Sequence, residues 1–396
     1  MNPYRIEFPP RWWRPALKPT LVRWLRPLRR RRRERVQKLM DVEVRGAEHV
    51  RGALAEKAGV LITPNHSAHA DPDAMYAAAD EVGRPFYFMS TWHVFDSHGL
   101  IGRRVLQWHG AFSVDREGAD LQAFKQAVKI VEKEPHPLVI FPEGEVYHCN
   151  DRVTPFREGA AAIALTAAKR AKRPVVCVPC ALKYRYLEDP TDELLRTMDE
   201  LERQIFWRPR PDRPLYQRIY EFAEAILALK EMEFLGKAAA GPLPQRIDAL
   251  ACEILHRLEQ RNGADRQDCT IPERVKTLRR ISLEQLENVE ENDPRHKQLH
   301  DDLDDLFLVV QLFSYPGDYV AERPSIERLA ETLDKFEEDV LGKYSAAVRS
   351  AREVTVQFGE PIAVPSTRNR KSAAGELTDT LERRVQEMLD GQTQAG

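Results

Sequence analysis

The sequence predicts an α/β fold in which a layered αβα core with a mostly parallel sheet carries a large all-helical insertion. Short apolar runs at 59–62, 137–141 and 175–179 predict buried strands. Helical segments separate these runs along the chain, and such an alternation is typical of a parallel sheet covered by helices. The stretch 187–345 instead has apolar residues at three-to-four spacing in segment after segment, which predicts helices.

The first predicted strand leads into a short polar string and then a helix. Asn65, His66 and Asp71 follow the run 59–62, and Pro72 marks the helix start. An imidazole takes up a proton near neutral pH, and a carboxylate beside it fixes its tautomer and stabilises its charged form. This pair suits deprotonation of a hydroxyl that then attacks a carbonyl. Asp71 also fits a helix N-cap before a proline, so a structural role stays open.

The segments that follow continue the alternation. Residues 110–116 end in Asp-Arg, and the strand 137–141 runs into a Pro-Glu-Gly-Glu turn at 142–145. Residues 155–171 open with Pro-Phe-Arg-Glu-Gly and form an alanine-rich helix before the strand 175–179. Residues at the carboxyl ends of parallel strands meet at one edge of the sheet, where such sheets bind ligands. The polar groups after these strands are therefore expected at a common site.

These strings, taken in order, resemble the four motifs of the lysophosphatidate (1-acyl-sn-glycerol-3-phosphate) acyltransferase family, within the glycerolipid acyltransferase superfamily. Asn-His-x4-Asp matches Asn65, His66 and Asp71. The others are Gly-x-Phe-x-Val-Asp-Arg at 110–116, Phe-Pro-Glu-Gly at 141–144 and the Val-Pro pair at 178–179. Residues 354–362 are similar to the strand and Gly-x-Pro turn that close the family's core. The resemblance covers roughly 41–186 and 352 to the end, and it implies a glycerolipid-acyltransferase-like core.

The resemblance implies transfer of a fatty acyl group from acyl-CoA or acyl carrier protein to the hydroxyl of a lysophospholipid, converting lysophosphatidate to phosphatidate. His66 would be the general base and Asp71 its orienting partner. No cofactor is expected besides the acyl-CoA or acyl-ACP co-substrate. The expected substrate-binding residues are Asn65, Phe112, Arg116, Glu143, Gly144, Arg152 and Arg157. A zinc site could be drawn from His66, His69 and Asp71, but no other Cys/His group has matching ligand spacing, so no metal is expected.

One departure from the family's pattern follows its third motif. Many members continue Phe-Pro-Glu-Gly with Thr-Arg, whereas this chain has Glu145 and Val146. The missing arginine removes a phosphate ligand, and Glu145 adds a negative charge. Either Arg152 or Arg157 replaces that arginine, or the acceptor is another lipid, such as an acylated amino-acid or sugar lipid. Outside enzymes, the alternative is a non-catalytic lipid-binding scaffold.

Charge is distributed unevenly along the chain. Residues 1–40 carry a net charge of +11, against −2 for the whole protein. The arginine block at 29–33 is preceded by Trp12, Trp13 and Trp24. Tryptophan beside arginine suits the interface of an anionic membrane. Packing on the acidic remainder of the chain and nucleic-acid binding are the alternatives. No motif that reads RNA or DNA is present, so we expect no nucleic-acid partner.

The predicted domain organisation has three parts. Residues 1–40 form a membrane-docking segment, 41–186 with 346–396 form the acyltransferase core, and 187–345 form the helical insertion. The insertion is expected to shield the acyl chain or to bind a partner or carrier protein. Five cysteines without a paired framework fit a reducing compartment. With neither a 20-residue apolar run nor a signal peptide in view, we expect a peripheral protein on the cytoplasmic membrane face.

Overall fold

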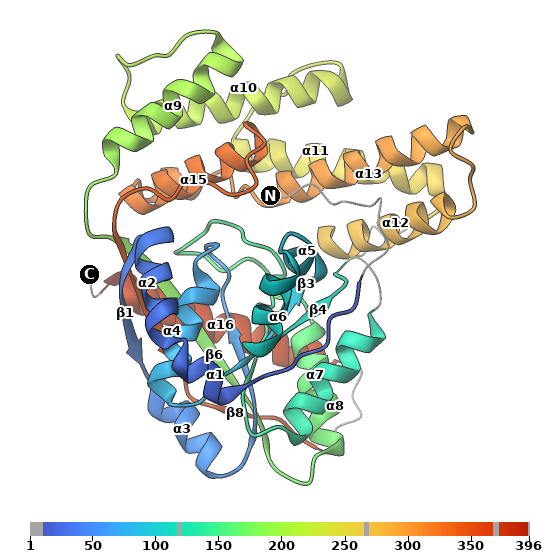
Figure 1. Ribbon diagram of the computed structural model, residues 1–396. Coiled ribbons are helices and arrows are strands. Elements are labelled where there is room, and N and C mark those ends of the chain that lie inside the picture. Colours follow the sequence, from blue (N-terminus) through green and yellow to red (C-terminus); the bar gives the residue numbers. More distant parts are fainter. Residues whose placement is uncertain (1–10, 117–119, 265–268, 367–371, 395–396) are drawn as a thin grey trace. The chain divides into compact units, whose positions relative to one another are not determined.

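The computed structural model describes residues 11–116, 120–264, 269–366 and 372–394 (Figure 1). The chain divides into two compact units. One, the helical unit, runs from Pro190 to Ala347. The other, the core unit, comprises the remaining described residues.

A single sheet forms the centre of the core unit. Among the described residues its eight strands are β1 (Leu39–Arg45), β2 (Gly59–Pro64), β3 (Tyr87–Thr91), β4 (Ala111–Val114), β5 (Leu138–Val139), β6 (Val175–Tyr186), β7 (Arg352–Phe358) and β8 (Ile362–Ala363). The order across the sheet is β1-β7-β6-β2-β5-β3-β4, and β8 pairs with β6. Strands β2 to β6 are mutually parallel, whereas β7 and β8 run antiparallel to β6. The prediction of an α/β fold with a mostly parallel sheet is confirmed.

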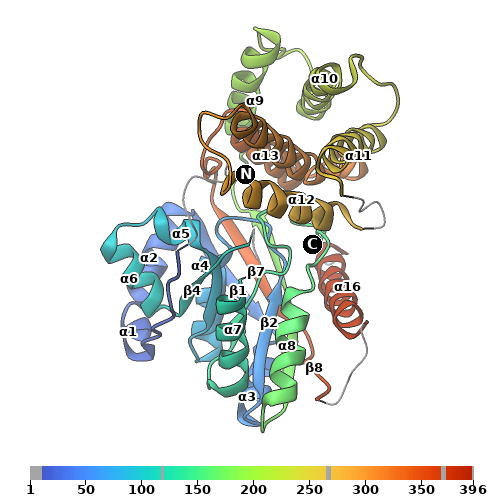
Figure 2. The same cartoon turned by 90° about the vertical axis from the view of Figure 1, so that its right-hand side faces the viewer.

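Helices cover both faces of this sheet. Helices α3 (Ala47–Ala55) and α4 (Asp71–Val82) pack in one apolar cluster, and α7 (Leu121–Lys133), α8 (Gly159–Arg170) and α16 (Ala373–Gln394) pack in another. In β2, Val60 and Ile62 belong to the first cluster and Leu61 to the second. Successive strand residues face opposite sides, so the continuous apolar run of β2 follows from burial on both faces. Figure 2 shows α4 and α16 on opposite sides of the sheet.

The N-terminal segment packs on the core unit. Helices α1 (Pro19–Trp24) and α2 (Arg26–Val36) precede β1. Arg29 donates to both carboxylate oxygens of Asp80 at 2.9 Å, and Arg32 pairs with Asp73 at 3.0 Å. Both acidic residues lie on α4, so part of the basic charge is neutralised within the unit, as in the packing alternative above. Residues 1–10 of the expected docking segment lie outside the described residues.

The tryptophans of this segment have different surroundings. The Trp13 ring stacks on Phe95 with centroids 5.3 Å apart, and Trp12 meets the edge of Phe112 at 6.2 Å. Trp24 is 82% exposed. Two short helices, α5 (Trp92–Asp96) and α6 (Leu100–Trp108), complete this side of the unit. None of the helices in the described part of the chain combines the length and apolar character needed to cross a bilayer.

The described residues of the helical unit form helices and no strand. These are α9 (Thr191–Phe206), α10 (Leu215–Leu235), α11 (Leu243–Asn262), α12 (Ile271–Leu286), α13 (Pro294–Phe313), α14 (Tyr319–Glu322) and α15 (Ile326–Asp339). Side chains of α10 to α13 build one apolar cluster. Buried arginine–glutamate pairs link consecutive helices, as where Arg274 donates to both oxygens of Glu259 at 2.8 Å.

Candidate active site

The strand-to-helix turn after β2 brings His66 and Asp71 into contact. His66 Nδ1 lies 2.8 Å from Asp71 Oδ2, with the imidazole 18% exposed and the carboxylate fully buried. Ala70, not Asp71, is the N-cap of α4, so Asp71 stands in the first turn with its side chain directed back at the turn. The Ala68 amide also donates to Asp71 Oδ2 at 3.1 Å. A carboxylate can only accept here, so Nδ1–H of His66 donates to Asp71. The other ring nitrogen, Nε2, is then left to accept a proton.

A buried tyrosine completes the surroundings of the carboxylate. The Tyr184 hydroxyl, on β6, donates to Asp71 Oδ1 at 2.7 Å. Burial and the neighbouring Asp71 raise the pKa of this phenol well above its ordinary value, so it remains a donor. Both oxygens of Asp71 are therefore held by hydrogen bonds, which fixes the direction from which the carboxylate meets His66.

Glu143 holds the backbone of His66 in place. Its Oε1 accepts from the His66 amide at 2.7 Å, and its Oε2 accepts from the Thr154 amide at 3.2 Å. Burial raises the pKa of this carboxyl to about 8, while the two amides favour the charged form. The Tyr147 amide donates to the His66 carbonyl at 3.2 Å, and the His66 ring stacks on Phe141 with centroids 4.1 Å apart. The connection after β5 thus contacts His66 on several sides.

Two buried asparagines continue the sheet with their side chains. β2 ends at Pro64, which is the last residue paired with β6. Beyond it, Asn65 donates to the Leu182 carbonyl at 3.1 Å and accepts from the Leu182 amide at 2.7 Å. Asn150 pairs with Tyr184 in the same way, with both bonds at 2.7 Å. These bonds satisfy the β6 backbone where β2 has left off.

A charged cluster surrounds Gly144. Arg116 Nη1 lies 2.6 Å from Glu145 Oε1 and donates to the Gly144 carbonyl at 2.5 Å. Gly144 has φ +83°, a left-handed conformation that favours glycine. A Cβ there would lie 2.9 Å from Cζ of Arg157, so this guanidinium lies against the glycine. The Gly144 amide donates to the Phe141 carbonyl at 3.1 Å, so it is not available to an oxyanion in this conformation.

The structure brings most of the expected site residues together, but not all of them. His66, Asp71, Glu143, Gly144, Arg116 and Arg157 gather through the contacts just described. Asn65 and Phe112 are fully buried, the first on the β6 backbone and the second against Trp12. Arg152 is half-buried beside Asp151, which forms an ion pair with Lys183.

Sequence reasoning missed Tyr184, Asn150 and Tyr147. Tyr184 is one of many buried residues in β6, and its contact with Asp71 spans 113 positions. No local pattern marks such a contact. It arises from the register in which β6 pairs with β2.

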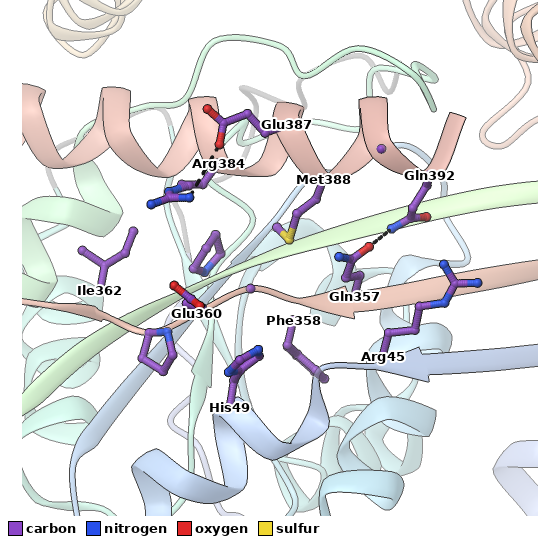
Figure 3. A pocket seen from close by; sticks show the side chains of 14 residues that line it. Arg45, His49, Gln357, Phe358, Glu360, Ile362, Arg384, Glu387, Met388 and Gln392 are labelled. Atoms are coloured by element: carbon purple, nitrogen blue, oxygen red, sulfur yellow. Dashed lines mark hydrogen bonds and ion pairs between the residues drawn. The ribbon is translucent and has the colours of Figure 1, made fainter. Parts of the chain in front are cut away.

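A separate cavity of about 520 Å³ lies where β6, β7 and α16 meet the start of α3 (Figure 3). Arg45, His49 and Glu360 line it together with Arg384 and Met388. Pro179 of the Val-Pro motif borders it, whereas His66 and Asp71 are not among its lining residues. This cavity is therefore distinct from the His66–Asp71 pair.

Known proteins resemble this part of the chain in sequence. The sequence model of the acyltransferase family matches residues 41–183. The 1-acyl-sn-glycerol-3-phosphate acyltransferase of Streptococcus pneumoniae (strain ATCC BAA-255 / R6) is 30% identical over 128 residues, which are 31% of this chain and 43% of that protein. The match thus spans less than half of the length of that curated relative. The region that holds His66, Asp71 and Glu143 therefore matches an acyltransferase domain.

Proposed function

We propose that the protein transfers a fatty acyl group from a thioester to the hydroxyl of a lysophospholipid, with His66 as general base. The observation that carries this proposal is the bond between His66 Nδ1 and the buried carboxylate of Asp71. It leaves Nε2 as the basic atom on a partly exposed ring. The acyltransferase domain supports the reaction class.

The proposed reaction proceeds without a covalent acyl-enzyme. His66 Nε2 takes the proton of the acceptor hydroxyl as the oxygen attacks the thioester carbonyl. The tetrahedral intermediate collapses, the carbon–sulfur bond breaks, and the imidazolium returns the proton to the leaving thiolate. Asp71 stabilises the imidazolium during these steps, and Tyr184 and Ala68 hold Asp71. The leaving thiol belongs to coenzyme A or to acyl carrier protein.

We also propose that the core unit docks on an anionic membrane through α1 and α2. Trp24 and Leu28 are 82% and 64% exposed, and Arg23 and Arg31 are exposed beside them in the sequence. Each basic group near an anionic surface contributes about 1 kcal/mol to binding. Arg29 and Trp13, by contrast, are committed to the core unit. The docking surface is thus only part of the basic segment.

The test is thiol release from palmitoyl-CoA on anionic liposomes that contain a lysophospholipid. His66→Ala is expected to lower turnover by about a thousandfold or more, since the base is lost. His256→Ala removes an imidazole from α11 of the helical unit and serves as the matched control. A His66→Ala protein that keeps the wild-type rate would rule this mechanism out.

A further inference from the structure

In the charged cluster beside His66, the positive charge of Arg116 is neutralised by a neighbouring carboxylate. Arg116 and Glu145 form an ion pair at 2.6 Å with side chains only 22% and 13% exposed. Arg116 also donates to the Gly144 carbonyl. A carboxylate therefore already faces Arg116, one of the residues expected to bind the acceptor.

The position of this pair next to the base is fixed by the chain. Glu145 lies between Glu143, which accepts from the His66 amide, and Tyr147, which donates to the His66 carbonyl. In a lysophospholipid the reacting hydroxyl is only a few bonds away from the phosphorus. A hydroxyl at His66 Nε2 consequently brings the head group close to Arg116 and Glu145.

The second cation of the cluster is Arg157, and it is available to bind an anion. The Arg157 guanidinium is half-buried and lies against Gly144. In the part of the chain that the structure describes, this guanidinium has neither an ion pair nor a hydrogen bond. The three side chains together offer one net positive charge, because Glu145 cancels Arg116.

We propose that the acceptor is a lysophospholipid with a phosphodiester head group, and that Glu145 disfavours a phosphate monoester. This inference rests on the proposed function. A monoester carries between one and two negative charges near neutral pH, whereas a diester carries one. Arg157 binds the single charge of the diester. Glu145 accepts a hydrogen bond from the hydroxyl or amine of the esterified alcohol, and it repels the second charge of a monoester.

The proposal is tested first by binding, without an acyl donor. Short-chain lysophosphatidylglycerol and lysophosphatidate with the same acyl chain are titrated into wild-type protein and measured by calorimetry. Wild-type protein is expected to bind the diester about tenfold more tightly than the monoester. Glu145→Gln, which keeps the shape of the side chain, should strengthen monoester binding about tenfold and thus remove the preference.

Two further variants check the assignment. Arg157→Gln should weaken binding of both lipids, because each uses its phosphate oxygens there. Glu158→Gln removes an exposed carboxylate one position further on and should change neither affinity. Equal or tighter binding of lysophosphatidate by wild-type protein, with no change in Glu145→Gln, would overturn the proposal.

The thiol-release assay separates this inference from the proposed function. Turnover on the diester that exceeds turnover on the monoester supports both. A diester preference in binding without thiol release from any acceptor would support the head-group site and contradict acyl transfer. Faster turnover on lysophosphatidate would support acyl transfer and overturn the head-group assignment.

Discussion

Replacing Tyr184 by phenylalanine is expected to slow acyl transfer while leaving KM for the acceptor unchanged. The hydroxyl lies 2.7 Å from Asp71 Oδ1, and both side chains are buried. A hydrogen bond to a charged group contributes about 1.5–3 kcal/mol, which would equal roughly 10- to 150-fold in rate if it were lost entirely from the transition state. His66 and Ala68 keep their bonds to Oδ2, so a loss of about tenfold in kcat is expected.

The assay measures kcat and KM by thiol release, with urea unfolding as a check on stability. Tyr87→Phe is the matched control. Tyr87 lies on β3, and its hydroxyl donates to Glu134 at 3.5 Å, outside the contacts of His66 and Asp71. The expected result is a lower kcat in Tyr184→Phe only. If both variants turn over at the wild-type rate, Tyr184 does not position Asp71, and the reasoning fails. An effect on KM alone would refute it as well.

Three other predictions concern Glu143, Gly144 and the membrane surface. Burial raises the pKa of Glu143 from 4.5 to about 8, so its contribution to stability is complete below pH 4.5 and is lost as the pH rises to 8. The free energy of unfolding measured in urea should therefore fall over this range by up to about 1.4 kcal/mol per pH unit, and Glu143→Gln should flatten the dependence. Gly144→Ala should lower Tm and weaken acceptor binding in calorimetry, at a cost of about 1–2 kcal/mol. Gly83→Ala has a similar φ but open space around it, so it should lower Tm alone. Trp24→Ala should reduce cosedimentation with anionic vesicles, whereas Trp12→Ala should mainly lower Tm. Unchanged vesicle binding in Trp24→Ala would contradict docking through α1 and α2.

The parts of the site that could be predicted are local in sequence. His66 and Asp71 belong to one strand-to-helix turn, so their spacing alone indicated contact, and the structure has them 2.8 Å apart. The role of Asn65 could not be foreseen in this way, because its partner Leu182 is 117 positions away. An asparagine next to a candidate base indicates a polar contact, but not which one. Here the Asn65 side chain bonds the backbone of β6.

In the fold, too, local features could be predicted from the sequence, whereas contacts between distant segments could not. Buried strands and the helices between them follow from apolar runs and their spacing. The sequence shows the basic block at 29–33 but not which charges it meets. Asp73 and Asp80 are seven residues apart and thus on one face of α4, where they face Arg32 and Arg29. In a sequence, two solvated carboxylates on a helix look the same as two that bind another segment, so the internal pairing of Arg29 and Arg32 became visible only in the structure.

The position of β7 imposes an order on the folding of the chain. β7 lies between β1 and β6, and β1 joins the sheet through it alone among the described strands. Yet β7 begins at Arg352, after the helical unit has been synthesised. Leu187 and Ala351 pair across the two ends of that unit. During translation β1 must therefore wait for more than three hundred residues before its partner emerges from the ribosome. Pairings between such distant segments form slowly and leave strand edges open in the meantime. If the helical unit has folded before β7 emerges, its two ends already lie close together, and β7 then needs less time to pair with β6 and β1.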